Sequence, residues 1–264
     1  MKKLETREPG LETSEWGTEQ PTVSNLQSFR EQRLVSYSLP ITGLSAMGFL
    51  RHAEGQERFF WEDVRDRITL AGFGSAANLM GWGDGRYTHI RQQAQTLFQD
   101  AVLLGDAPEL ARPRLFGGFA FRDDFLPDNT WAAFQPAHFI LPHYQFVRVG
   151  QETWLTINAL IPLTDDPADS LPILQEALQT RRDVLLESGV WRVENSPHAT
   201  RHSLSYPMSP DEWARLIHAV QQEIATTELK KVVLARVCEA RFDERINIYN
   251  ALAFLNKAYA DCYR

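Results

Sequence analysis

The sequence predicts an α+β fold, with a mainly antiparallel sheet and helices packed outside it. The chain has 264 residues, of which 44% are hydrophobic, so it can bury a large core. Short runs rich in β-branched and aromatic residues are separated by polar turns, as is typical of neighbouring antiparallel strands. Other segments repeat their apolar residues at helical spacing. Together these observations favour one large domain or two small ones built from both types of element.

Residues 1–34 are expected to form a mobile N-terminal arm, because they are polar and lack apolar periodicity. An α+β region is predicted over residues 35–189. It opens with three short strands: LVSYSLPI (34–41), RFFWED (58–63) and ITLAGFG (68–74). A helix should follow, with one apolar face made by Ile90, Ala94, Leu97, Phe98 and Ala101.

The rest of this region returns to strands and ends in a helix. LFGGFAF (115–121) is predicted as a strand. HFILPHYQFVRVG (138–150) and ETWLTINALI (152–161) should form a hairpin, and Pro142 confines the first of them to an edge or a bulge. The final helix is predicted from four leucines on one face, with Pro172 in its first turn: Leu171, Leu174, Leu178 and Leu185.

Residues 190–208 are expected to form a linker, because they are rich in Ser, Pro and His and show no periodicity. Residues 209–264 then start a second region. Ser209-Pro210-Asp211-Glu212 has the pattern of a capped helix start. The run LKKVVLARV (229–237) is predicted as a strand, and Asn247 should cap a last helix.

Composition excludes several classes of protein. The formal net charge of -7 and the absence of a long Lys/Arg run argue against nucleic acid as a partner. No apolar run is long enough to cross a membrane or to act as a signal peptide, so a cytoplasmic protein is expected. Two cysteines, Cys238 and Cys262, form no C-x-x-C pair, which argues against disulfide frameworks and thiolate metal sites.

Two motifs match known sites only in part. The segment from Gly72 to Ala77 fits the G-x-G-x-x-[GA] dinucleotide fingerprint, but the glycines that follow it would break the required helix, so a glycine-rich turn is predicted. His198 and His202 are four residues apart, but their segment has no helical pattern, so they are interpreted as linker histidines. A different pair, Gly117-Gly118, marks a bulge or the close approach of another backbone.

Lys230 and Lys231 enter a segment that otherwise has the pattern of a buried strand. Side chains alternate along a strand, so Lys231 shares a face with Val233, and Lys230 shares the other face with Val232. One interpretation is that each ammonium group extends to water at the strand end. The other is that one amine lies in a dry cavity, where it can act as a base near neutral pH. Arg236 is expected to be a structural ion-pair partner without a catalytic role.

The segment ELKKVVLAR resembles the K-V-V-L-[AS]-R motif of the chorismate-utilising enzymes, whose fold is similar to that of anthranilate synthase component I. RFFWED, ITLAGFGSA and LFGGFAF resemble the N-terminal strands of isochorismate synthases in the same order. The resemblance runs from about residue 35 to the end, and the lysine motif is its most specific part. It implies that Lys231 is the base that deprotonates water for attack on the chorismate ring, whereas anthranilate-type members carry glutamine there and use ammonia.

The same resemblance implies the rest of the reaction. Water adds at ring C2, the double bonds shift, and the C4 hydroxyl leaves with the help of a glutamic acid. A Mg²⁺ ion holds the substrate carboxylate. In the family, that glutamate and the Mg²⁺ ligands lie beyond the position of Arg264, so this chain is similar to the N-terminal part of the enzyme and is expected to be inactive alone. Uncovered sheet edges should favour self-association or leave the final sixty or so residues mobile.

The resemblance therefore implies a truncated isochorismate synthase that feeds menaquinone synthesis, with a siderophore pathway as the open alternative. Salicylate synthase is the close alternative, because it shares the lysine and then eliminates pyruvate. A non-catalytic module that keeps the fold is a third interpretation.

Overall fold

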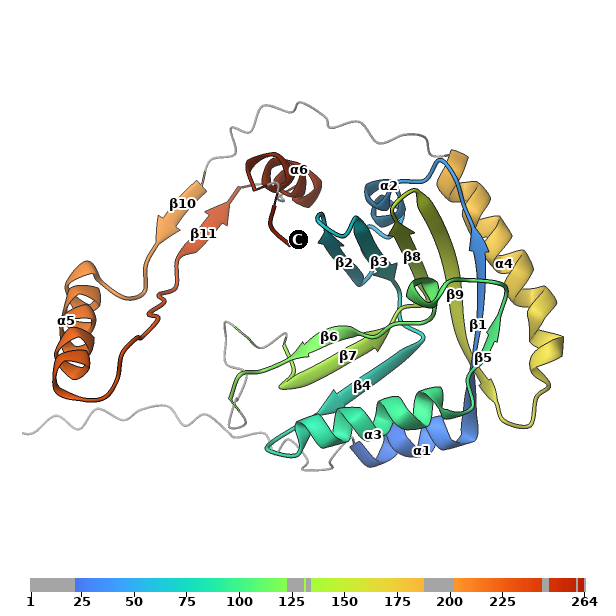
Figure 1. Cartoon of the computed structure of the whole chain (residues 1–264), viewed down its shortest axis with the longest axis horizontal. Helices are drawn as coiled ribbons and strands as arrows, with labels where there is room; N and C mark the ends of the chain where they lie inside the picture. The colour runs from blue at the N-terminus through green and yellow to red at the C-terminus, as the bar shows by residue number, and fades with distance from the viewer. Residues whose placement is uncertain are drawn as a thin grey trace, which may run out of the picture. The chain divides into compact units, whose positions relative to one another are not determined.

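The computed structural model describes residues 22–122, 131, 134–187, 202–243, 247–259 and 261–263. Contacts divide the chain into two compact units (Figure 1): residues 1–191 with 261–264, and residues 192–260. The first unit contains the strands β1 to β9 with α1 to α4, and the second contains β10, β11, α5 and α6.

The first unit is built on two sheets. Its helices are α1 (Thr22–Glu31), α2 (Ala46–Arg51), α3 (Arg86–Gln99), α4 (Pro167–Glu187) and the 3-10 helix η1 (Glu109–Ala111). Its strands are β1 (Gln32–Pro40), β2 (Arg58–Asp63), β3 (Ile68–Phe73), β4 (Ala77–Gly81), β5 (Val102–Leu104), β6 (Phe116–Phe119), β7 (Ala137–Leu141), β8 (Tyr144–Val149) and β9 (Glu152–Pro162). One sheet has the order β2-β3-β8-β9-β1-β5 and the other β4-β7-β6. Every pair except β1–β5 is antiparallel, which confirms the predicted fold class.

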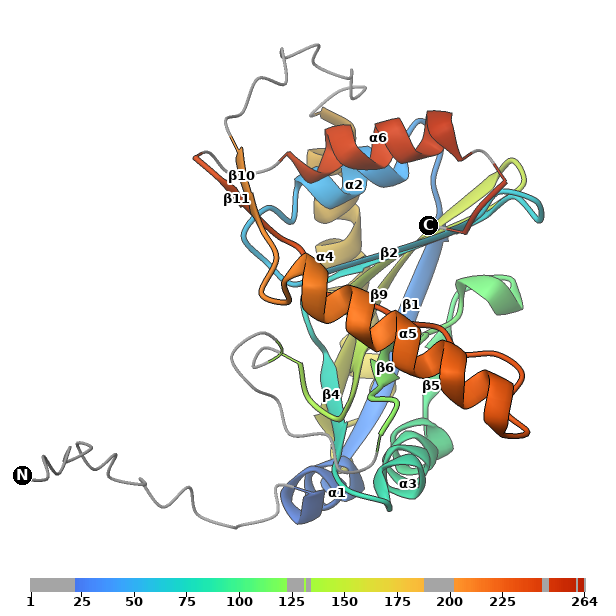
Figure 2. The same cartoon turned by 90° about the vertical axis from the view of Figure 1, so that its left-hand side faces the viewer.

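Part of the expected N-terminal arm is helical, and this part of the prediction is wrong. Residues 22–31 of the expected arm form α1, and β1 starts at Gln32. Phe29 explains the helix, because its side chain is 6% exposed and packs in one cluster with Leu34, Leu79 and Leu97. A single buried aromatic residue fixes the segment without producing the apolar periodicity that predicts a helix. Figure 2 shows α1 lying beside α3.

Pro142 has a different role from the one predicted. It lies between β7 and β8, and these strands belong to different sheets. β7 is the central strand of its sheet, so the expected edge or bulge around Pro142 is wrong. The missing N–H of proline is tolerated because the chain leaves one sheet here and enters the other. The hairpin itself is formed by β8 and β9, with Gly150 at a φ of 60° in the turn.

The glycine-rich turn is confirmed. Gly72 lies in β3, Gly74 has a φ of 66°, and β4 starts at Ala77. A left-handed φ favours glycine because it has no Cβ. The chain therefore passes from strand to strand here, whereas a dinucleotide site of this fingerprint needs a helix after the glycines.

The two faces of the six-stranded sheet differ in polarity. Val35, Tyr37 and Leu39 of β1 lie opposite Ala159, Ile157 and Leu155 of β9, and α4 packs against these two strands. The other face carries a polar seam. Ser36 Oγ donates to Asn158 Oδ1 at 2.8 Å, and the Ser38 and Thr156 hydroxyls are 2.8 Å apart. All four side chains are buried, and each has a partner, as buried polar groups require.

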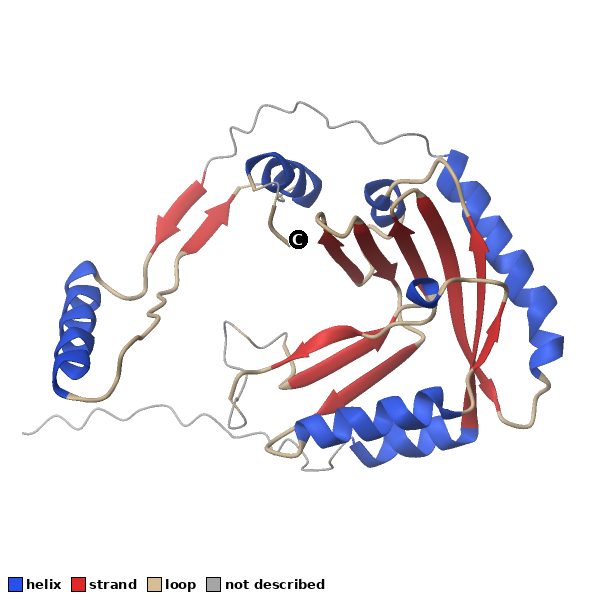
Figure 3. Cartoon of the chain, viewed as in Figure 1, coloured by secondary structure: helices blue, strands red, loops and turns tan. Residues whose placement is uncertain are grey.

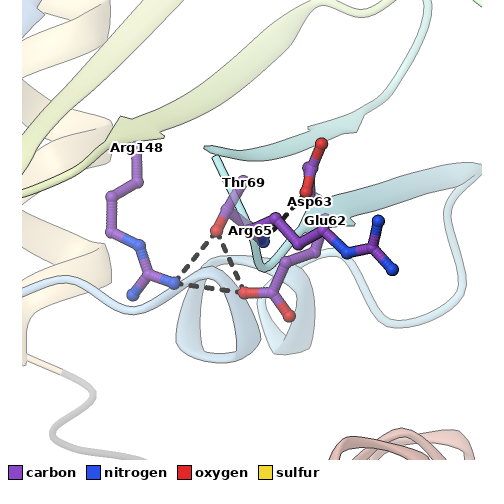
Figure 4. A network of polar contacts seen from close by, with 5 residues as sticks. All are labelled: Glu62, Asp63, Arg65, Thr69 and Arg148. Atoms are coloured by element: carbon purple, nitrogen blue, oxygen red, sulfur yellow. Dashed lines mark hydrogen bonds and ion pairs between the residues drawn. The ribbon is translucent and has the colours of Figure 1, made fainter. Parts of the chain in front are cut away.

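A second polar network lies on β2, β3 and β8 (Figure 4). Arg148 Nη2 is 3.2 Å from Glu62 Oε1 and donates to Thr69 Oγ1 at 2.9 Å. Asp63 Oδ1 accepts from the backbone N–H of Arg65 at 2.9 Å, at the start of the β2–β3 turn. The network links three neighbouring strands through cross-strand side chains, which helps to fix their register.

The second unit contains β10 (His202–Ser205), α5 (Pro210–Thr226), β11 (Glu239–Phe242) and α6 (Ile248–Ala258). β10 and β11 form an antiparallel pair. Residues 190–201 of the predicted linker lie outside the described residues. Residues 202–205 are a strand, so the predicted linker over 190–208 is wrong there: pairing with β11, which is distant in sequence, decides the conformation. Asn247 caps α6 as predicted, since its Oδ1 accepts from the N–H of Tyr249 at 3.0 Å.

The predicted helix start at Ser209 is confirmed in detail. The N–H of Glu212 donates to Ser209 Oγ at 3.2 Å, and the N–H of Ser209 donates to Glu212 Oε2 at 2.8 Å. Ser209→Ala should therefore destabilise α5 by about 1 kcal/mol. Hydrogen exchange of the first-turn amides of α5 measures the change. Ser203→Ala, on β10, is the control, and equal protection in both variants would show that the cap contributes nothing.

The unfolding free energy of the first unit should depend on pH through His143. Burial lowers the pKa of its imidazole, the backbone hydrogen bond at Asn158 opposes this, and the Arg181 guanidinium lowers the pKa further. The folded state therefore binds this proton less readily than the unfolded state. The unfolding free energy should be largest above the ordinary histidine pKa of about 6.5 and should fall as the pH drops below it.

The measurement is denaturant unfolding of the first unit between neutral and acidic pH. His143→Gln should show a weaker loss of stability on acidification. His52 contributes in the same direction, because burial, Arg181 and Arg51 lower its pKa, so the loss should shrink without vanishing. An unchanged pH profile in His143→Gln would contradict the assignment.

Candidate active site

Lys231, the predicted catalytic residue, lies in the second unit just after α5. The helix ends at Thr226, and the Thr227 hydroxyl donates to the carbonyl of Glu223 at 2.8 Å and accepts from the N–H of Leu229 at 3.1 Å. The chain then runs from Leu229 to Cys238 without helix or strand, and Figure 3 draws it as a loop.

The strand predicted over residues 229–237 is not formed. A strand needs partners for its backbone N–H and C=O groups, and none of the strands in the described ranges pairs with this segment. Its apolar side chains are consequently open to water, with Val233 81% exposed. The side chain of Lys231 is exposed as well. The described residues do not enclose it in the dry pocket that base chemistry needs, and its catalytic role stays a prediction.

Arg236 anchors the far end of this segment. Its guanidinium carbon lies 4.4 Å from the ring centre of Tyr206 and 5.7 Å from that of Trp213 on α5. The contacts are with aromatic faces, which attract a planar cation, whereas the sequence predicted an ion pair. Next to it, the Cys238 thiol hydrogen-bonds to the Tyr206 hydroxyl and raises the pKa of that phenol. Arg236 therefore has a structural role in joining the loop to α5.

The described residues offer no site for a metal ion. Within them, no group of three or more His, Cys, Asp or Glu side chains is placed to hold one. His198 lies outside the described residues, and His202 is the first residue of β10. Cys238 and Cys262 are free and exposed. These residues do not fit the Mg²⁺ ion that the resemblance implies.

A match to a protein family covers most of the chain. The model of the family described as "Chorismate binding enzyme" matches residues 21–264. The chain belongs to the chorismate-binding enzyme family. The matched range includes both the N-terminal strands and the segment with Lys231, which are the residues that carry the resemblance.

Two curated relatives support the membership. The chain is 25% identical over 231 residues to isochorismate synthase MenF of Bacillus subtilis, a match that covers 84% of the chain and 47% of the relative. It is 24% identical over 247 residues to the salicylate biosynthesis isochorismate synthase of Pseudomonas aeruginosa, covering 93% of the chain and 49% of that protein. The chain thus spans about half the length of the relatives it matches.

A solved structure supports the fold. The chain is similar to MenF, the menaquinone-specific isochorismate synthase of Escherichia coli, with a TM-score of 0.52 and 19% identity. The likeness covers 92% of the chain and 52% of the MenF chain. At this identity it shows a shared mixed α/β architecture of the chorismate-binding family. Separately, no described helix combines the length and the apolar character needed to cross a membrane.

Proposed function

We propose that this chain is the N-terminal part of an isochorismate synthase, an enzyme that converts chorismate to isochorismate. The observation that carries the proposal is the family match over residues 21–264, which includes a lysine directly before V-V-L. Two relatives with isochorismate synthase in their names support it. Residues 35–189 form the N-terminal α+β region in this proposal, and residues 209–264 start the catalytic half.

Lys231 acts as the general base in this proposal. Its neutral amine takes a proton from water as the water oxygen forms a bond to ring C2 of chorismate. The ring double bonds shift, and the C4 hydroxyl leaves as water after it receives a proton from an acid. Water needs such a base because it is a much weaker nucleophile than ammonia. The acid and the Mg²⁺ ligands are expected outside this chain, and no step is assigned to a metal held by the described residues.

The experiment compares three proteins incubated with chorismate and Mg²⁺, with the products separated by chromatography. The chain alone is expected to give no turnover. A fusion of the chain to the second half of the Bacillus subtilis relative is expected to give isochorismate, and that second half alone serves as the control. A folded, monodisperse fusion that leaves chorismate unchanged would contradict the proposal and favour a non-catalytic module.

Salicylate synthase is the second candidate. The name of the Pseudomonas aeruginosa relative links its isochorismate synthase to salicylate biosynthesis. Release of pyruvate and formation of salicylate by the same fusion would favour this function, and isochorismate as the final product favours the first. A role in menaquinone synthesis is supported by the solved neighbour, which is a menaquinone-specific enzyme. A cytoplasmic location and self-association of the isolated chain remain predictions.

A further inference from the structure

Arg181 of α4 has no polar partner in the described part of the chain. The side chain is half-buried, and its guanidinium carbon lies 4.9 Å from the ring centre of Tyr144 and 5.8 Å from that of Phe73. These two rings pack together where β8 begins and β3 ends, with centroids 5.1 Å apart. Attraction to aromatic rings leaves the N–H groups of an arginine available for other partners. None of those of Arg181 has a hydrogen bond or an ion pair with a described residue.

Two histidines lie beside this guanidinium. The His143 ring is edge-on to Tyr144, with centroids 4.6 Å apart, so it packs on the same ring as the guanidinium. His52 directly follows α2, and Phe49 of α2 packs on Phe73 at a centroid distance of 4.8 Å. Three groups that can carry positive charge therefore come together from three separate parts of the chain.

The charged groups that act on the two imidazoles are cations. Burial lowers the pKa of both His143 and His52 most strongly, and the Arg181 guanidinium lowers both pKa values further. Arg51 lowers the pKa of His52 as well. The whole chain has a formal net charge of -7, so this group of cations differs in sign from its surroundings. Positive groups held close together attract an anion.

A groove of about 500 Å³ runs along α4 beside Arg181 and Tyr144. Ile173 and Val184 give it an apolar lining, and Glu176 is the carboxylate in this lining. Glu176 lies five residues before Arg181, whereas neighbours on a helix surface are three or four residues apart. No ion pair joins these two side chains. The guanidinium therefore stays available, and the groove has room for the organic part of a ligand.

We propose that Arg181, His143 and His52 bind a phosphate group, either free or as the ester of a small organic molecule. A phosphate group carries nearly two negative charges near neutral pH and several strong acceptor oxygens. It can therefore accept hydrogen bonds from the planar guanidinium and from the imidazoles at the same time, whereas a carboxylate has fewer oxygens and a single charge. Every residue involved belongs to the first unit. The inference does not depend on the proposed chorismate chemistry.

Titration of the whole chain with inorganic phosphate and with phenyl phosphate tests the proposal. The ionic strength is held constant, and the imidazole signals are followed by NMR. Bound phosphate should raise the pKa of His143 and of His52, because a nearby negative charge favours the protonated imidazole. The signal of His218, on α5 of the second unit, should not respond. Tighter binding of phenyl phosphate would identify an ester as the ligand, and equal affinities would identify free phosphate.

Arg181→Gln should weaken phosphate binding by about tenfold or more, equal to about 1.4 kcal/mol. Arg182→Gln is the matched control and should keep the affinity, because Arg182 Nη2 is already paired with Asp183 Oδ1 at 2.8 Å. If Arg181→Gln shifts the unfolding midpoint, His143→Gln is the second variant and should weaken binding in the same direction. Imidazole signals that respond to neither compound at millimolar concentration would overturn the proposal. Equal losses of affinity in Arg181→Gln and Arg182→Gln would overturn it as well, since they would show attraction by surface charge alone.

Discussion

Replacing Lys231 by alanine is expected to lower isochorismate formation by about 10²–10⁴-fold, the usual contribution of a general base. The side chain is exposed in this chain and lies outside any helix or strand, so its removal should leave the second unit folded. The measurement is the steady-state rate of isochorismate formation by the fusion protein, together with its circular dichroism spectrum.

Lys230→Ala is the matched control. Lys230 is the adjacent lysine and is also exposed, and strand alternation in the complete enzyme would turn it to the opposite face. Its loss should leave the rate nearly unchanged. Lys231→Gln replaces the basic amine by an amide. It should abolish attack by water as the nucleophile, since a glutamine amide cannot accept the proton. Comparable rates for Lys231→Ala and Lys230→Ala would refute the role of Lys231.

Elements stabilised by neighbouring residues could be predicted from the sequence. The capping box at Ser209 and Glu212 requires only residues three apart, and the structure contains both of its hydrogen bonds. α3 and α4 follow from apolar residues spaced along one helix face. Elements held by partners that are distant in the sequence could not be predicted in this way. β10 depends on β11, and α1 depends on the burial of Phe29 in a core made by later strands.

The segment with Lys231 shows the same dependence on distant partners, but here a predicted strand is missing. Its residues have a strong strand pattern, but a strand forms only where another backbone pairs with it. The described residues provide no such partner. The residue pattern alone therefore predicted a strand that is not formed. The role of Lys231 came from a family resemblance, because a catalytic site combines groups from several elements that spacing within one segment cannot bring together.

Gln145→Ala should lower the unfolding free energy of the first unit by about 3 kcal/mol or more, since each unsatisfied buried group costs about 1–3 kcal/mol. The Gln145 side chain is fully buried on the polar face of the sheet. Its Nε2 donates to the carbonyl oxygens of Ala111 at 3.2 Å and Arg112 at 3.0 Å, and its Oε1 accepts from the N–H of Arg114 at 3.0 Å. The Gln145 side chain thus connects β8 to the segment around η1. Urea unfolding measures the change, with Gln92→Ala on the exposed side of α3 as the control.

Gln145→Met separates hydrogen bonding from packing, because methionine keeps most of the volume and removes the amide. It should cost nearly as much stability as alanine, and full stability would show that the segment is held by packing alone. Thr156 provides a sharper test, since its hydroxyl also donates to the Ala111 carbonyl, at 3.0 Å. With either donor in place that carbonyl keeps a partner. Thr156→Val combined with Gln145→Met removes both donors, so the double variant should lose more stability than the sum of the single losses.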